Sequence, residues 1–307
     1  MAGAKEDERN TAMPPASAKN FEKPMNFRTA IIVHVFYLDI WPEISSAIRN
    51  LLEAGGDAVV VFATFPNGRK EVADTIKKDF PSAHLIGVNN VGWDVWPFFV
   101  VLNRLNLQEW DLIVKLHTKR NVHSVWMNFR PFFRDDGWRK ALLSFCSTLQ
   151  AAKRSFRAFS VQPRLGMVAG ERVIDPNGLG MNRAIDSCVA LLPDKRLPSR
   201  PFVIVWGTMW MVRAHILKHF WRRWREYDFS SPDINNPHMD YGLAGDCEML
   251  FGTLVSSQGY IVSSGRLPRW LANIHFVFKM FTFKVIRSIS NILRKLTFLK
   301  TRSYMSR

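Results

Sequence analysis

The first half of the chain alternates short apolar segments with helical patterns, and few folds accommodate that order. The apolar segments are rich in β-branched residues, which indicates buried strands. They are TAIIVHVFY (29–37), DAVVVFATF (57–65), AHLIGVN (83–89) and WDLIVKLHT (110–118). Helical patterns separate them, at residues 41–53, 68–80 and 95–106. Because such an alternation uses right-handed crossovers, the sequence predicts an open, mainly parallel α/β sheet with helices on both faces.

The second half is less regular, and its elements are predicted one by one. The expected helices lie at 136–152, near 181–192, at 214–224 and from 239 to Gly259, and the expected strands at 164–170 and 202–213. The last of these strands, FVIVWGTMWMVR, is strongly apolar and is predicted to be continuous.

Length and composition predict one main domain with two appendages. The chain has 307 residues, of which 47% are apolar, enough for one large core. Residues 1–26 are polar and read as a disordered leader, residues 27–265 as the α/β domain, and residues 266–307 as a basic tail. After Glu248 the chain has no acidic residue, and Phe, Ile and Leu alternate with Lys and Arg at roughly helical spacing. The tail therefore predicts an amphipathic helix on an anionic membrane surface, with a helix packed on the core as the alternative.

The net charge and the cysteine content limit which ligands and which cellular compartment are plausible for this chain. The formal net charge of +16 attracts phosphates, whether in nucleotide-sugars, lipid head groups or nucleic acid. The three cysteines are far apart and form neither a disulfide framework nor a zinc pattern, which fits a reducing compartment. The N-terminus lacks the apolar core of a signal peptide, and no apolar run is long enough to span a bilayer. We expect a cytoplasmic protein that contacts the inner face of the cell membrane.

An N-x-G-x-D pattern follows the third predicted strand and consists of Asn90, Gly92 and Asp94. Ligands of open α/β sheets bind beyond the carboxyl ends of the strands, which is where this pattern lies. Gly92 lets the backbone approach a ligand closely. Asp94 is suited to accept hydrogen bonds from a sugar or base hydroxyl, and the alternative is an ordinary helix N-cap.

A basic cluster ends the fourth predicted strand. Strand alternation places Lys115, His117 and Lys119 on one face. Three basic groups there repel each other unless an anion lies among them, and a diphosphate is such an anion. The alternative is a solvated edge with Asp111 as the ionic partner.

Two further segments carry candidate residues. Gly207 and Thr208 lie within the apolar segment 202–213, where a glycine suggests close approach of a ligand or of backbone. Asp240 and Glu248 are eight residues apart in a predicted helix and so share a face. A carboxylate there is a candidate general base. The alternatives are helix capping for Asp240 and a structural ion pair with an arginine for Glu248.

These segments, in this order, resemble the rhamnan synthesis protein F family. The resembling pieces are HVFYLDIWPEI, NVGWDVWPFF, DLIVKLHTKR, FVIVWGTMWMVRA and DYGLAGDCEMLFG, which together span about residues 30–262. The resemblance implies a bacterial cell-surface polysaccharide glycosyltransferase, rhamnosyltransferase-like, with a GT-A-like nucleotide-binding domain. It assigns the donor site to Asn90, Gly92, Asp94, Lys115, His117, Thr118, Lys119, Gly207 and Thr208, and the helix carboxylates to Asp240 and Glu248.

The resemblance also suggests a mechanism. GT-A-like domains carry an acidic metal-binding pair after the fourth strand, and this chain has His117, Thr118 and Lys119 there. We therefore expect direct contact of His117 and Lys119 with the donor diphosphate, with neither metal nor cofactor, and inversion through Glu248 or Asp240 as the base. The expected partners are a nucleotide-sugar, a saccharide or lipid-linked acceptor, and the membrane surface.

Two other classes compete with this hypothesis. A non-catalytic carbohydrate- or membrane-binding module of the same fold has the same sequence features, and turnover of a nucleotide-sugar separates the two. A nucleic-acid-binding protein is disfavoured, because the basic residues are scattered through helices and concentrated in the tail, and no known nucleic-acid module is present.

Overall fold

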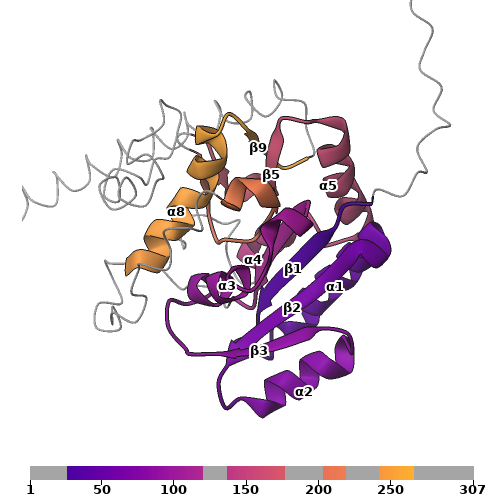
Figure 1. The fold of residues 1–307 in the computed structure, drawn as a ribbon, viewed down its shortest axis with the longest axis vertical. Helices are drawn as coiled ribbons and strands as arrows, with labels where there is room; N and C mark the ends of the chain where they lie inside the picture. Colours follow the sequence, from indigo (N-terminus) through magenta and orange to yellow (C-terminus); the bar gives the residue numbers. More distant parts are fainter. Residues whose placement is uncertain (1–25, 120–136, 177–202, 219–241, 266–307) are drawn as a thin grey trace, which may run out of the picture.

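The computed structural model describes residues 26–119, 137–176, 203–218 and 242–265 (Figure 1). The first half confirms the predicted alternation of strands and helices. Its strands are β1 (Thr29–His34), β2 (Val59–Pro66), β3 (His84–Val88) and β4 (Leu112–His117). Its helices are α1 (Trp41–Gly55), α2 (Lys70–Asp79) and α3 (Val95–Leu102), with 3-10 turns η1 (Gly56–Ala58) and η2 (Leu107–Glu109).

The second half contains shorter elements. They are α4 (Gly137–Leu143), α5 (Leu149–Val161), β5 (Leu165–Ala169), η4 (Glu171–Val173), β6 (Ile174–Asp175), β7 (Ile204–Val205), β8 (Trp210–Arg213), α8 (Gly242–Ser257) and β9 (Ile261–Ser263). Residues 214–218 are helical, as predicted. The expected leader, the helix near 181–192 and the basic tail lie outside the described residues.

The single helix predicted at 136–152 is wrong. The chain forms α4 and α5 instead, because polar groups interrupt the helical ladder between them. Thr148 caps α5 by accepting a hydrogen bond from the Ala151 N–H at 3.1 Å. Between the two helices, the Cys146 carbonyl accepts a hydrogen bond from the Asn50 side chain at 3.1 Å.

The described strands build a seven-stranded sheet in the order β3-β2-β1-β4-β8-β5-β9. Neighbouring strands are parallel except where β8 pairs with β4 and β5, so the prediction of a mainly parallel sheet is confirmed. Because β8 is antiparallel, its first residue lies at the carboxyl end of β4, and Lys115 pairs with Trp210. The segment that precedes β8 thereby reaches the edge where the parallel strands end.

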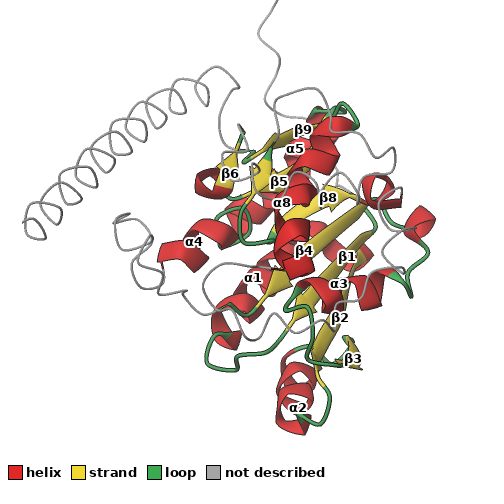
Figure 2. Ribbon diagram, turned by 90° about the vertical axis from the view of Figure 1, so that its left-hand side faces the viewer, coloured by secondary structure: helices red, strands yellow, loops and turns green. Residues whose placement is uncertain are grey.

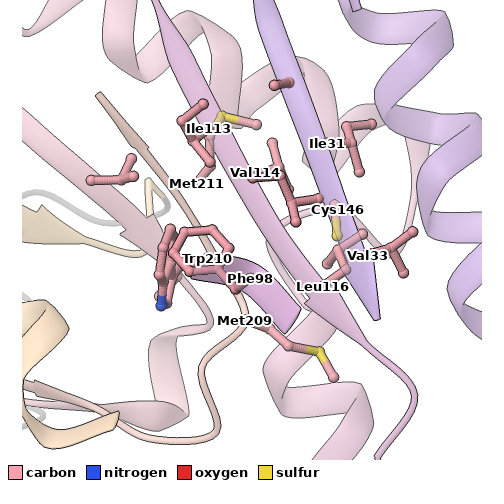
Figure 3. Packing of buried hydrophobic residues seen from close by; sticks show 14 of the residues in the cluster. Ile31, Val33, Phe98, Ile113, Val114, Leu116, Cys146, Met209, Trp210 and Met211 are labelled. Carbon is pink, nitrogen blue, oxygen red and sulfur yellow. The ribbon is translucent and has the colours of Figure 1, made fainter. Parts of the chain in front are cut away.

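Helices cover both faces of this sheet (Figure 2). Helices α1 and α5 pack together on one face, and α3 and α8 pack together on the other, as right-handed crossovers on either side of β1 require. Figure 3 shows the core around β4, where the Phe98 and Trp210 rings meet edge to face at 5.4 Å on the α3 side. Val33, Leu116 and Cys146 are buried in the same core. Within the described ranges, no helix is both long and apolar enough to cross a membrane.

Candidate functional site

A buried ionic cluster lies at the carboxyl edge of the sheet and is centred on Asp94. Lys115, which is 1% exposed, donates from Nζ to Asp94 Oδ2 and, at 2.9 Å, to Thr208 Oγ1. The Thr208 hydroxyl donates in turn to the same Oδ2 atom. Residues from three separate parts of the chain therefore share one carboxylate oxygen.

The charges of this cluster compensate each other. Burial alone raises the pKa of Asp94, but His117, which is protonated at the low pH where this carboxyl titrates, together with Lys115 and Lys119 outweighs burial, so the pKa of Asp94 lies well below its usual range. Burial lowers the pKa of Lys115, and the ionised Asp94 opposes that shift. The sequence predicted an anion among Lys115, His117 and Lys119, and in the structure that anion is the Asp94 carboxylate. The alternative partner is wrong, since Asp111 Oδ2 accepts from the Arg28 N–H at 2.8 Å.

His117 is part of the cluster as a neutral group. Its Nε2 lies 2.8 Å from the Gly207 carbonyl oxygen, which can only accept, so Nε2 carries the hydrogen. Burial lowers the pKa of His117 to about 3, which leaves the ring uncharged near neutral pH. The expectation of His117 as a cation is therefore wrong, because the ring is desolvated and its Nε2–H is already used.

The Gly207–Thr208 turn breaks the strand predicted at 202–213. Gly207 has φ +81° and Thr208 has φ +52°, and an extended strand cannot continue through two left-handed residues. The Gly207 N–H donates to Glu248 Oε1, and its carbonyl accepts from His117. A side chain at Gly207 would bring Cβ to 2.4 Å from Leu142 Cδ2, so glycine is required there on two grounds. Local β propensity is overridden by these tertiary contacts.

Glu248 reaches this turn from α8. Its Oε1 accepts the Gly207 N–H, and its charge acts on Lys115. Glu248 and Asp94 thus each hold one residue of the turn through a single carboxylate oxygen. The hydrogen bonds of the described residues engage neither Glu248 Oε2 nor Asp94 Oδ1. Asp240 lies outside the described residues.

The N-x-G-x-D pattern forms the turn into α3. Gly92, with φ +59°, accepts hydrogen bonds from the N–H groups of Val95 and Trp96 at 3.0 and 3.1 Å. Asp94 occupies the N-cap position but its side chain caps nothing, so the capping alternative is wrong. Asn90 is exposed at the same edge.

The two residues that follow His117 point in different directions. Thr118 Oγ1 accepts from the N–H groups of Phe36 and Tyr37 at 2.8 and 2.9 Å, so it holds the loop after β1 and lies apart from the cluster. Lys119 is half-buried and close enough for its charge to act on Asp94. The structure therefore gathers Asp94, Lys115, His117, Lys119, Gly207, Thr208 and Glu248, and leaves Thr118 outside that group.

Sequence reasoning missed a polar row beside the cluster. Thr64 of β2, His34 of β1 and His117 of β4 are in register and buried at the strands' carboxyl ends. His34 Nδ1 lies 3.0 Å from Thr64 Oγ1, and burial lowers the pKa of His34 to about 4. Polar residues at the end of otherwise apolar strands were the available signal. In the part of the chain with described side chains, no three His, Cys, Asp or Glu residues are grouped so as to hold a metal ion.

Comparisons with known proteins give one family, distant curated relatives and several weak structural likenesses. The profile of the family described as rhamnan synthesis protein F matches residues 8–177. Proteins described as uncharacterized protein WxcX, from two strains of Xanthomonas campestris pv. campestris, are 27% identical over 238 residues, which is 76% of this chain. The aligned region is 32% of their length, so the chain spans about a third of these relatives.

The solved structures include a cytidylyltransferase from Leptospira borgpetersenii, with TM-score 0.36, 11% identity, and coverage of 77% of this chain and 75% of that one. A second is a 4-diphosphocytidyl-2C-methyl-D-erythritol synthase, with TM-score 0.37, 10% identity, and coverage of 82% and 97%. At these scores the likeness carries no argument about ligand or reaction.

Proposed function

The chain belongs to the rhamnan synthesis protein F family, and from that premise we propose that it is a glycosyltransferase of bacterial polysaccharide assembly. It transfers a sugar, with rhamnose as the first candidate, from a nucleotide-diphosphate donor to a saccharide or lipid-linked acceptor. The observation that carries the proposal is the Asp94-centred cluster at the carboxyl edge of the sheet, where open α/β sheets bind ligands.

Each of the two carboxylates in the cluster uses one oxygen to hold the protein structure and has a second oxygen that can contact a substrate. Asp94 Oδ2 and Glu248 Oε1 hold the Gly207–Thr208 turn. We assign Asp94 Oδ1 to a donor hydroxyl and Glu248 Oε2 to the acceptor hydroxyl, whose proton it removes as the sugar is transferred with inversion. Lys115 and His117 then act as positioning residues, which differs from the diphosphate contacts expected from the sequence.

We assign binding of the donor diphosphate to Lys119, since Lys115 already forms an ion pair with Asp94. Lys119 lies where the chain leaves β4, at the same edge as the exposed Asn90. A cation at this position stabilises the leaving nucleoside diphosphate. We place the reaction on the cytoplasmic side of the membrane.

The proposal is tested by offering a set of nucleotide-sugars and measuring release of nucleoside diphosphate, with and without saccharide acceptors. Turnover of at least one donor is expected. Thermal stabilisation by donors without any turnover contradicts the proposal and favours the non-catalytic carbohydrate-binding alternative.

Replacement of Lys119 by Ala is expected to weaken nucleoside-diphosphate binding by about 1.5–3 kcal/mol, the scale of a hydrogen bond to a charged group. Isothermal titration calorimetry measures the effect directly. Lys77→Ala, which removes an exposed lysine of α2, serves as the matched control and should leave binding unchanged. Equal affinity of the Lys119 variant and the wild type would show that the diphosphate binds elsewhere.

Transfer activity is expected to persist in excess EDTA. Asp94 Oδ2 already accepts a hydrogen bond from Lys115, and the positive charges of Lys115 and Lys119 would repel a divalent cation placed beside them. Initial rates are compared before and after chelation, and again after Mn²⁺ or Mg²⁺ is returned. Loss of activity on chelation with recovery on Mn²⁺ addition would overturn the assignment and would move Asp94 to a metal site.

A further inference from the structure

The outer face of α5 carries charge of a single sign. Lys153, Arg154 and Arg157 are exposed there, and residues 137–170, which include this helix, hold six Lys or Arg and no Asp or Glu. Residues 26–119 differ, since their nine Lys or Arg are balanced by ten Asp or Glu. The excess positive charge of the described residues is therefore concentrated in the segment that forms α4 and α5.

The stability of the helix does not explain this charge. Lys153 and Arg157 are four residues apart, which makes them neighbours on the helix surface, and like charges at that spacing destabilise a helix. Helix α2 has the usual solvated pattern, in which Asp74 lies four residues before Lys78. A helix face with cations alone is suited instead to an anion outside the protein.

This basic face ends in an exposed apolar side chain. Val161 is 65% exposed and lies four residues after Arg157 and eight after Lys153, so it shares their side of the helix. A single exposed apolar residue by itself means little. An apolar side chain next to several cations, however, is suited to a surface that combines negative head groups with hydrocarbon.

The basic C-terminal segment begins beside the same helix. A Cβ atom at Gly265 would lie 3.7 Å from the Ala158 Cβ atom, so the chain after β9 passes next to α5. Residues 266–307 follow directly and hold ten Lys or Arg and no Asp or Glu. Since two stretches of like charge begin side by side, one anionic surface can neutralise both.

We propose that the outer face of α5, formed by Lys153, Arg154, Arg157 and Val161, docks the protein on an anionic phospholipid surface. The cations bind the head groups, and the valine enters the boundary between head groups and acyl chains. Helix α5 packs with α1 on one face of the sheet, so a bilayer against its outer side leaves the carboxyl edge uncovered (Figure 1). The inference goes beyond the proposed function and does not depend on it.

The test compares two neutralised pairs of equal charge change in the full chain. Lys153→Gln with Arg154→Gln alters the basic face, and Lys77→Gln with Lys78→Gln alters two adjacent exposed lysines of α2. Partitioning onto phosphatidylcholine vesicles with and without phosphatidylglycerol is measured by co-sedimentation. The α5 pair should lower the partition coefficient on anionic vesicles about 30-fold, the effect of two cations at such a surface. The α2 pair should lower it less than about 3-fold, because its charges lie away from the bilayer and are screened.

The valine distinguishes a bilayer from other polyanions. Val161→Ser should lower the partition coefficient on anionic vesicles about 3- to 10-fold, since an inserted apolar side chain is lost. Because Val161 is exposed, its replacement should leave the melting temperature unchanged. An unchanged partition coefficient in Val161→Ser overturns the proposal, as does an equal loss, or no loss, in the α5 and α2 pairs.

Nucleic acid is the competing polyanion, and duplex DNA is tested at the same phosphate concentration as the vesicles. Tighter binding to the duplex than to the vesicles, lost in the α5 pair, would overturn the proposal and assign the basic face to nucleic acid. The proposed function fails by a different result. A protein that binds vesicles through α5 but turns over no nucleotide-sugar would refute glycosyl transfer and leave this inference standing.

Discussion

Replacement of Asp94 by Asn is expected to destabilise the protein by about 3–5 kcal/mol, the usual cost of breaking a buried ion pair. Lys115, at 1% exposure, would remain as a buried cation without its partner. The free energy of unfolding is measured with urea. The exposed pair of Arg69 and Glu71 is the control, because solvent screens it, and Glu71→Gln should have little effect.

A double variant separates this structural role from catalysis. Lys115→Met removes the cation and retains an unbranched side chain of similar length, so Asp94→Asn combined with Lys115→Met should be clearly more stable than Asp94→Asn alone. Transfer activity should be low in Asp94→Asn and should stay low in the double variant, because both lack the charged carboxylate assigned to the donor. Recovery of both stability and activity would mean that Asp94 is a structural residue alone.

The strands and most helices of the first half could be predicted because their signals are local. Buried strands such as β1 and β4 consist of consecutive apolar, β-branched residues, and the parallel arrangement follows from the helices between them. Predicting the strands and predicting their parallel arrangement both succeed without knowing which strands are neighbours in the sheet.

The partners inside the site could not be predicted, because they depend on strand order. Asp94 meets Lys115 because the segment between β3 and α3 leads the chain from the edge strand back across β2 and β1 to β4. Thr208 joins them because β8 inserts antiparallel beside β4. Asp94 and Lys115 were correctly expected at strand ends, whereas Thr208 was placed inside a continuous strand. The sequence pattern contains nothing about these two crossings.

The broken strand at 202–213 has a similar cause. Its residues favour extended backbone, but contacts from residues distant in sequence hold Gly207 and Thr208 in left-handed conformations. His117 and Glu248 bind the Gly207 backbone, and Asp94 and Lys115 bind the Thr208 hydroxyl. Such strain is commonly found at functional sites, where the surroundings over-determine the backbone. Disagreement between local propensity and structure is therefore itself consistent with a working site at this turn.

The last prediction concerns Glu248. Its replacement by Gln is expected to lower turnover about 10²- to 10⁴-fold, the usual contribution of a general base, while donor affinity stays nearly unchanged. The Gln side-chain oxygen still accepts the Gly207 N–H, so the turn should keep its position. Steady-state kinetics and calorimetric donor binding measure the two quantities separately.

Comparison with Glu248→Ala shows whether Glu248 acts in chemistry or only in positioning. The Ala variant loses the base and also leaves the Gly207 N–H without its acceptor, which should lower stability by about 1–3 kcal/mol. Glu43→Gln, at the Glu43–Arg139 ion pair, is the carboxylate control, and Asp240→Asn tests the second predicted base. If Glu248→Gln retains near-normal turnover while Glu248→Ala loses it, Glu248 is a positioning residue. The acceptor proton then goes to Asp240 if Asp240→Asn is inactive, and to Asp94 if that variant is active.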